Sequence, residues 1–296
     1  MRDGGPAATI TSDGVVAVTK PAGPTSHDVV DRARRALGVR RLGHLGTLDP
    51  AAEGVLVLVV GRATRLAQYA GAWPKTYEGV IRFGRSTTTD DATGETIETS
   101  EAWRTLGQEE VARALAAFVG GYEQVPPAYS ALKVSGERAY RRARRGEAVP
   151  LAPRRVEVRE IGLLDWAPPD ARFRAVVGGG TYLRSLARDA GTALGCPAHL
   201  AALVRTAVGP FTLADAVDAH ALAPADLRDA AVLVADLPRR ELDAAEREAV
   251  LHGRPIPGDH AQRATRNVVL FAGRELIAVA EPVGGVLKPR VVIAEP

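Results

Sequence analysis

Two periodicities of apolar residues divide the chain into elements. Apolar and polar residues that alternate, or short apolar runs, are typical of strands, whereas apolar residues three or four positions apart indicate helices. The first pattern predicts strands over residues 14–20, 55–61, 75–84, 156–166 and 171–180. The second predicts helices over residues 27–38, 62–71, 108–120 and 181–195. Several strands follow one another without a helix, which favours an α+β fold with a mixed, largely antiparallel sheet over a doubly wound parallel one.

Local signals add detail to this outline. Ser26 stands where it can cap the helix that begins at His27. In the strand over residues 75–84, the alternation places the side chain of Tyr77 on the same face as two apolar neighbours. The polar, turn-rich stretch over residues 86–101 indicates a surface loop or the end of a hairpin.

Breaks in this pattern and shifts in composition predict two domains and a tail. Residues 1–12 are polar and indicate a disordered tail. Residues 13–225 carry most of the predicted elements and form the main domain. The composition shifts near residue 225, and the C-terminal domain, residues 226–296, begins with a stretch up to residue 256 that predicts helices. From residue 266 on, short strands separated by Gly and Pro predict a small β-domain.

Composition narrows the class of protein. The 296 residues are 46% apolar and 25% charged, which is ordinary for a folded globular chain. No apolar run is long enough to span a bilayer, and the N-terminus lacks the apolar stretch of a signal peptide. We therefore expect a soluble, cytoplasmic protein. A single cysteine, Cys196, excludes an intrachain disulfide, and the scattered histidines make a zinc site unexpected.

The charge distribution says more than the net charge of +3. One basic group lies within eight residues and another in the first helix and the loop after it. They comprise Arg138, Arg141, Arg142, Arg144 and Arg145, and Arg32, Arg34, Arg35, Arg40 and Arg41. Such clusters suit a polyanionic partner such as a nucleic acid, and equally suit solvated helix faces.

The stretch GHLGTLDPAAEGVL, residues 43–56, holds a candidate catalytic carboxylate. Asp49 precedes Pro50, which restricts the backbone, and follows Gly43 and Gly46, which permit tight turns. Such a loop can hold one carboxylate in a fixed place. On its own, however, an Asp-Pro pair is more often a structural turn.

Three further stretches could contribute to a site. In GGGTYLRSLARD, residues 178–189, a strand ends in glycines and a helix starts with Tyr182 and Arg184; this arginine could pair with a carboxylate across a cleft. Tyr77 could stack on a base. Aromatic residues beside the basic group in VPPAYSALKVSGERAYRRARRG suit a clamp on nucleic acid. Taken singly, each has a plainer structural interpretation: an exposed arginine, a core tyrosine and an irregular insertion.

Together these stretches resemble the TruB family of tRNA pseudouridine synthases. The resemblance rests on KPAGPTS, GHLGTLDPAAEGVL, KTYEG, the basic segment and GGGTYLRSLARDAG, in that order over about residues 14–215. It implies the pseudouridine synthase fold with a C-terminal PUA-like domain. The implied activity is isomerisation of the T-loop uridine of tRNA, position 55, to pseudouridine by base flipping. The implied partner is the T-arm of tRNA; no cofactor, metal, membrane or protein partner is expected, and we expect a monomer.

The resemblance also assigns roles to residues. Asp49 matches the catalytic aspartate, Tyr77 the tyrosine that stacks on the target base, and Arg184 the arginine that pairs with the aspartate. Substrate contacts are implied for a second set, in which Lys20, with Pro21, supports the active-site loop, and residues 124–146 match an insertion that folds over tRNA. That set is His44, Tyr182, Leu203, Lys20, Lys133, Arg141 and Arg142.

Some features depart from the family pattern or leave alternatives open. Val204 stands where an arginine is often seen beside Leu203, and residues 216–265 show no clear motif. Asp49 could attack C1′ of the nucleotide or act as a base at C2′ to give a glycal. The guide-RNA-dependent branch of dyskerin type shares the G-T-L-D-P block but generally lacks the insertion. A non-catalytic RNA-binding protein on the same fold is the remaining alternative.

Overall fold

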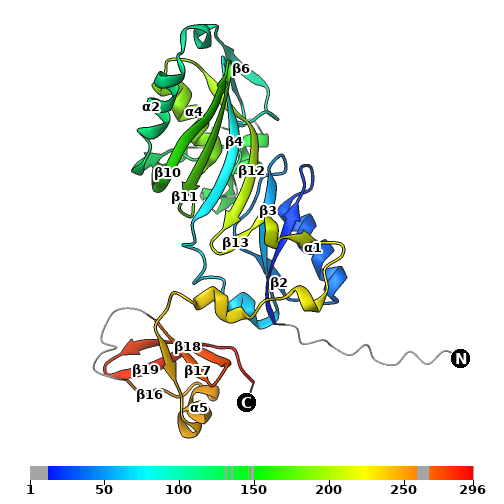
Figure 1. Ribbon diagram of the computed structural model, residues 1–296, viewed down its shortest axis with the longest axis vertical. Helices are drawn as coiled ribbons and strands as arrows, with labels where there is room; N and C mark the ends of the chain where they lie inside the picture. Colours follow the sequence, from blue (N-terminus) through cyan, green and yellow to red (C-terminus); the bar gives the residue numbers. More distant parts are fainter. Residues whose placement is uncertain are drawn as a thin grey trace, which may run out of the picture.

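A computed structural model describes residues 13–130, 132–134, 136–145, 147, 150–258 and 267–295. The predicted tail over residues 1–12 lies outside the described residues. A long, twisted sheet carries the main domain, and a smaller sheet lies at one end of the molecule (Figure 1). Among the described residues, no helix has the length and apolar character needed to cross a membrane.

The main sheet is mixed and largely antiparallel, as predicted. Its strands follow the order β14-β1-β3-β12-β4-β11-β10-β7, with β2 and β13 pairing beside β3 and β12. Only the β1–β14 and β3–β12 pairs of this sheet are parallel. The strands are β1 (Gly14–Lys20), β2 (Leu42–His44), β3 (Glu53–Val60), β4 (Lys75–Phe83), β7 (Gly120–Gln124), β10 (Arg154–Ala167), β11 (Asp170–Val177), β12 (Ala198–Val208), β13 (Phe211–Thr212) and β14 (Val217–Asp218).

The five strands predicted in the main domain are all present, but one central strand was not predicted. β12 pairs with β4 over most of its length and with β3 at Val204 and Arg205, so it joins the two halves of the sheet. Its sequence, AHLAALVRTAV, has no strict alternation and contains four alanines, which have low strand propensity. Pairing with neighbours on both sides therefore decides its conformation.

Helices cover the two ends of the sheet differently (Figure 1). α2 (Gln108–Ala116) and α4 (Leu183–Ala193) pack with β4, β10 and β11 in one apolar cluster, and α1 (Ser26–Leu37) packs on β1 and β3 in another. The predicted helix over residues 62–71 is only the 3₁₀ helix η1 (Gly61–Leu66). A second 3₁₀ helix, η2 (Ala102–Thr105), precedes α2.

The predicted cap of the first helix is wrong by one residue. Thr25 is the N-cap, and it forms a capping box with Asp28. Ser26 is buried and is the first helical residue. Its hydroxyl is used instead at the candidate site described below.

Two small hairpins project from the main sheet. β5 (Arg85–Thr87) and β6 (Thr96–Thr99) form the hairpin expected in the polar stretch. β8 (Lys133–Val134) and β9 (Glu137–Arg138) pair within the predicted insertion and are followed by the short helix α3 (Ala139–Arg144).

The C-terminal part forms a five-stranded sheet of order β15-β17-β18-β19-β16. Residues 226–256, predicted as helices with a loop, also contain β15 and the first residue of β16; β15 pairs with β17 and β16 with β19. Val269 and Phe271 share an apolar cluster with Trp73 and Phe211 of the main domain. The elements after β14 are η4 (Pro224–Asp226), η5 (Ala230–Val234), β15 (Arg239–Glu241), α5 (Ala244–Leu251), β16 (Ile256–Pro257), β17 (Val268–Ala272), β18 (Glu275–Val283) and β19 (Val286–Val292), and η3 (Leu213–Asp215) lies before it. The domain boundary near residue 225 stays a prediction.

Candidate active site

A cavity of about 740 Å³ opens between the Asp49 loop, β4, β12, the start of α4 and the insertion. Tyr129, Ser130 and Tyr140 line it from the insertion. Most of the residues expected at the site also line it. These are His44, Asp49, Tyr77, Tyr182, Arg184 and Leu203. The fold therefore brings together residues that lie up to 159 positions apart in the sequence.

Lys20 fixes the backbone of the Asp49 loop through hydrogen bonds. Its side chain is fully buried at the end of β1, and its ammonium group donates hydrogen bonds to the carbonyl oxygens of Pro21, Pro50 and Ala52 at 3.0, 3.1 and 2.6 Å. Burial lowers the pKa of Lys20, while the nearby carboxylate of Asp49 opposes that shift. Lys20 thus fixes the backbone directly after the aspartate without lining the cavity.

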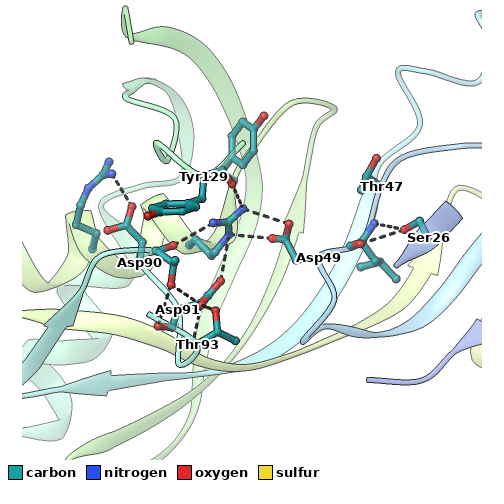
Figure 2. A network of polar contacts seen from close by, with 12 residues as sticks. Ser26, Thr47, Asp49, Asp90, Asp91, Thr93 and Tyr129 are labelled. Carbon is teal, nitrogen blue, oxygen red and sulfur yellow. Dashed lines mark hydrogen bonds and ion pairs between the residues drawn. The ribbon is translucent and has the colours of Figure 1, made fainter. Parts of the chain in front are cut away.

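Ser26 fixes the same loop through two hydrogen bonds with Leu48. Its hydroxyl donates to the carbonyl oxygen of Leu48 at 3.0 Å and accepts from the amide of Leu48 at 2.9 Å. Figure 2 shows this reciprocal pair next to Thr47. Both bonds are buried, and buried polar groups of the backbone require such partners. The residue immediately before Asp49 is therefore fixed at both of its peptide groups.

Arg205 is one of the residues at this site that the sequence analysis missed. It lies on β12 and is fully buried, and its guanidinium donates to the carbonyl oxygens of Val55 at 2.8 Å and Gly46 at 3.0 Å. Gly46 has φ +89°, a conformation that glycine adopts readily. An arginine inside an apolar stretch, one position after Val204, was the available signal.

Gly54 permits the close approach of β3 to β12 beneath the loop. A Cβ atom at this position would lie 2.2 Å from the carbonyl oxygen of Arg205, and the residue has φ +110°. Both the contact and the backbone conformation exclude a larger residue. The glycine pattern near Asp49 therefore serves the packing of the loop against Arg205.

Asp49 and Arg184 form a two-point ion pair at the cavity wall. Arg184 Nε lies 2.8 Å from Asp49 Oδ2, and Nη2 lies 3.1 Å from Oδ1. The arginine side chain is 5% exposed, whereas the aspartate side chain is 43% exposed. A buried guanidinium thus orients a carboxylate that still faces the cavity.

The same guanidinium is fixed by groups from two other segments. Nη1 donates to the Thr89 carbonyl oxygen and Nη2 to the Tyr129 carbonyl oxygen, both at 3.0 Å. Asp91 Oδ2 lies 3.7 Å from Nε. Figure 2 shows Asp49, Asp91 and Tyr129 around this one guanidinium. Arg184 is therefore held on all sides rather than by Asp49 alone.

Asp90 and Asp91 were expected only as part of a polar surface loop. Asp91 accepts hydrogen bonds from the hydroxyls of Thr89 and Thr93, both at 2.6 Å. Asp90, with φ 58°, pairs with Arg188 at 2.9 Å, and burial raises its pKa. The β5–β6 hairpin thus brings a second carboxylate to Arg184, a role without a local sequence signal.

The other predicted residues of the cavity wall lie on β4, on β12, before α4 and at the end of β2. Tyr77 is nearly buried on β4, with the rest of its alternating face. Leu203 lies on β12 opposite Gly79 of β4. Burial raises the pKa of Tyr182, and burial together with Arg205 lowers the pKa of His44.

The insertion carries charge of both signs. Arg142 pairs with Glu147 at 2.9 Å, and Arg145 pairs with Glu137 at 2.7 Å and with Glu147 at 2.6 Å. Arg141 is exposed on α3. Lys133 lies in β8, and its side chain lies outside the described residues. RNA contacts by Lys133, Arg141 and Arg142 stay a prediction.

The donor set of the cavity offers acid–base and electrostatic chemistry. Within the described ranges, no group of three or more His, Cys, Asp or Glu residues is placed to hold a metal ion. A single partly exposed carboxylate, an aromatic wall and an apolar wall remain the main features. These suit acid–base or nucleophilic chemistry by one carboxylate beside an aromatic group.

Comparison with known proteins gives consistent matches. Residues 34–183 match the model of the TruB family pseudouridylate synthase N-terminal domain, and residues 184–244 match the tRNA pseudouridylate synthase B C-terminal domain. The second match includes residues 216–244, part of the region that showed no clear motif.

Curated relatives match over nearly the full length. The tRNA pseudouridine synthase B of Thermobifida fusca is 47% identical, with 96% of this chain and 99% of the relative covered. The protein of that name from Burkholderia pseudomallei is 42% identical over 94% of this chain and 95% of the relative. Among solved structures, a Cbf5-Nop10-Gar1 complex contains a chain with a TM-score of 0.72 and 25% identity, over 96% of this chain and 86% of the other.

Proposed function

The chain belongs to the TruB family of pseudouridine synthases acting on tRNA, and on that premise we propose that it isomerises the T-loop uridine, position 55, to pseudouridine with Asp49 as the catalytic residue. The observation that carries the proposal is the Asp49–Arg184 pair, in which a buried cation orients a carboxylate toward the cavity.

The reaction needs one carboxylate beside the ribose. The N1–C1′ bond of the uridine breaks, the uracil turns, and a C5–C1′ bond forms while C5 loses its proton and N1 gains one. Asp49 either attacks C1′ to give a covalent ester or removes the C2′ proton to give a glycal, and both routes pass through cationic character at C1′. The fixed guanidinium of Arg184 keeps the carboxylate oriented in either route.

The cavity walls suit retention of the detached base. Tyr77 offers an aromatic face and Leu203 an apolar one, and both line the same cavity as Asp49. Between such walls a uracil can rotate without escaping to water. In this proposal the phenol of Tyr77 relays the proton that leaves C5.

Access to the uridine requires flipping it out of the folded T-loop, at a cost of a few kcal/mol. We infer that the insertion, with Lys133, Arg141 and Arg142, contacts the T-arm phosphates and offsets that cost. The C-terminal PUA-like sheet supplies further RNA contacts. We further propose that the chain acts in the cytoplasm as a monomer without a protein partner.

The test follows tritium release from C5-labelled uridine in an unmodified tRNA transcript. We expect the purified chain alone to release about one equivalent per tRNA, and Asp49→Asn to release none, because the amide keeps the shape of the side chain but is neither nucleophile nor base. A substrate with the T-loop uridine replaced by cytidine is the matched control and should release nothing.

Other outcomes would select the alternatives. Binding of tRNA without release by either protein would favour a non-catalytic RNA-binding protein. Release that requires added guide RNA and protein partners would favour the guide-dependent branch. Release that persists when the T-loop uridine is replaced would overturn the proposed position.

A further inference from the structure

Hydrogen bonds connect Gln124 and Val125, at the start of the insertion, to Tyr182 and Ser185 at the start of α4. We call this contact the seam, and Gln124 and Val125 the root of the insertion. Gln124, the last residue of β7, is 1% exposed. Its Oε1 accepts a hydrogen bond from the backbone amide of Tyr182 at 2.8 Å, and its Nε2 donates to the Tyr182 carbonyl oxygen at 3.1 Å. The backbone N–H can only donate, so the orientation of the side-chain amide is fixed.

Tyr182 is the N-cap residue of α4, and its own side chain makes no capping bond. The amide of Gln124 holds the backbone at that point from another element. The Nε2 group also contacts the hydroxyl of Tyr122, which fixes the side chain on its own strand. The position of the first turn of α4 relative to β7 therefore depends on Gln124.

Arg184 lies in that first turn, two residues after Tyr182. Its guanidinium reaches Asp49 and the carbonyl oxygen of Tyr129 in the insertion at the same time. With 5% exposure it has little room to compensate for a shift of the helix. A displacement of this turn would therefore misalign the carboxylate of Asp49.

We propose that Gln124 is a positioning residue, which acts through Tyr182 and Arg184 to align Asp49 and links that alignment to the root of the insertion. This inference rests on the proposed function. Gln124 does not line the cavity and contacts neither Asp49 nor Arg184 in the hydrogen bonds above. Its loss should therefore slow the reaction without weakening tRNA binding.

A second contact across the same seam supplies the matched control. The hydroxyl of Ser185 donates to the carbonyl oxygen of Val125 at 2.8 Å, and Arg188 Nη2 donates to that same oxygen at 2.8 Å. Ser185→Ala removes one buried hydrogen bond, but the carbonyl keeps its other donor and the Tyr182 backbone is untouched. A general loosening of the seam would show in this variant too.

The experiment measures the single-turnover rate of tritium release at saturating tRNA, the Kd for tRNA and the Tm of each variant. For Gln124→Met, which keeps the length of the side chain, we expect a rate at least about tenfold lower and a Kd within about twofold of wild type. Gln124→Glu keeps the acceptor for the Tyr182 amide and should fall between wild type and Gln124→Met; it also serves if Gln124→Met does not fold. Ser185→Ala should keep the wild-type rate.

A double variant tests whether Gln124 acts through Arg184. Adding Gln124→Met to Arg184→Lys should slow release by no more than about twofold beyond Arg184→Lys alone, since coupled residues are not additive. A multiplicative loss would overturn the proposal, as would a Gln124→Met rate equal to wild type or an equal loss in Ser185→Ala. Absence of Asp49-dependent release by wild type would instead overturn the proposed function, and this inference with it.

Discussion

The Asp49 loop and the insertion face the same cavity but are held by opposite means. Buried side chains from three distant elements bind the backbone of the loop: Lys20 from β1, Ser26 from α1 and Arg205 from β12. The described ion pairs of the insertion lie at its surface, and the Arg145–Glu137 pair has side chains 50% and 37% exposed.

The difference follows the physics of each environment. A buried hydrogen bond to a backbone carbonyl is costly to break because the carbonyl is left without water, whereas an exposed ion pair contributes little and is screened by salt. The loop is therefore built to keep one geometry for the chemistry. The surface ion pairs of the insertion can be given up at small cost, as the proposed contact with RNA phosphates would require.

Glycine substitutions should give the largest difference in unfolding free energy between the Asp49 loop and the insertion. Gly54→Ala should lower the free energy of unfolding by about 3 kcal/mol or more, because it combines a strained φ with a Cβ atom 2.2 Å from the Arg205 carbonyl oxygen. Gly136→Ala is the control in the insertion: it also has positive φ, but its Cβ would meet open space, and about 1 kcal/mol is expected. Urea unfolding measures both, and equal losses would contradict the comparison.

Removal of a cationic side chain should lower stability more in the Asp49 loop than in the insertion. Lys20→Met removes this donor from the carbonyl oxygens of Pro21 and Ala52, while that of Pro50 keeps the amide of Gly23 at 2.8 Å. We expect a loss of about 2 kcal/mol in unfolding free energy, and slower release with unchanged Kd. Arg141→Met should do the reverse: stability should be unchanged, and tRNA binding should weaken. The slope of log Kd against log salt concentration should fall by about one. If Lys20→Met bound tRNA more weakly but released tritium at the wild-type rate, the contrast between the loop and the insertion would be wrong.

Neutralising a carboxylate of the insertion should have a smaller effect. Glu137→Gln removes a partner of Arg145 at the surface, so the Tm should stay within about 2 °C of wild type. The guanidinium then interacts more readily with phosphate, and tRNA should bind up to a few-fold more tightly at low salt. Filter binding across a salt series measures this, and weaker binding would show that Glu137 itself supports the RNA contact.

The smallest effect should be a difference in acid sensitivity. Burial lowers the pKa of His44 below its unfolded value, so the unfolded chain binds more protons between the two pKa values and stability falls as the pH drops below about 6.5. Hydrogen bonds from Arg145 lower the pKa values of Glu137 and Glu147, so their contribution is lost only as the pH falls below about 4.5 toward those lowered values.

Melting curves between pH 7.5 and 5 test the difference. His44→Asn should flatten the loss of Tm over that range in part, because His199, whose pKa is also lowered by burial, remains. Glu137→Gln should leave the slope unchanged over the same range. An unaltered slope in His44→Asn would assign the acid sensitivity to another group.

Local pattern was sufficient for much of the fold. The alternation of β4 predicted which side chains are buried, and the apolar run of β3 predicted a buried strand. It failed for β12, whose alanines and buried Arg205 give no strand signal, and for the cap at Ser26, whose hydroxyl is taken by Leu48. Each failure lies where a contact from a distant element overrides local preference.

The sequence by itself determined the order of most elements, the family and the loop that carries Asp49, because periodicity and short motifs depend only on neighbouring residues. Only the tertiary structure decided what surrounds that carboxylate. Arg184 is 135 positions from Asp49, and Arg205 is 150 from Val55. Such pairs are set by strand register and helix placement, so no local pattern records them.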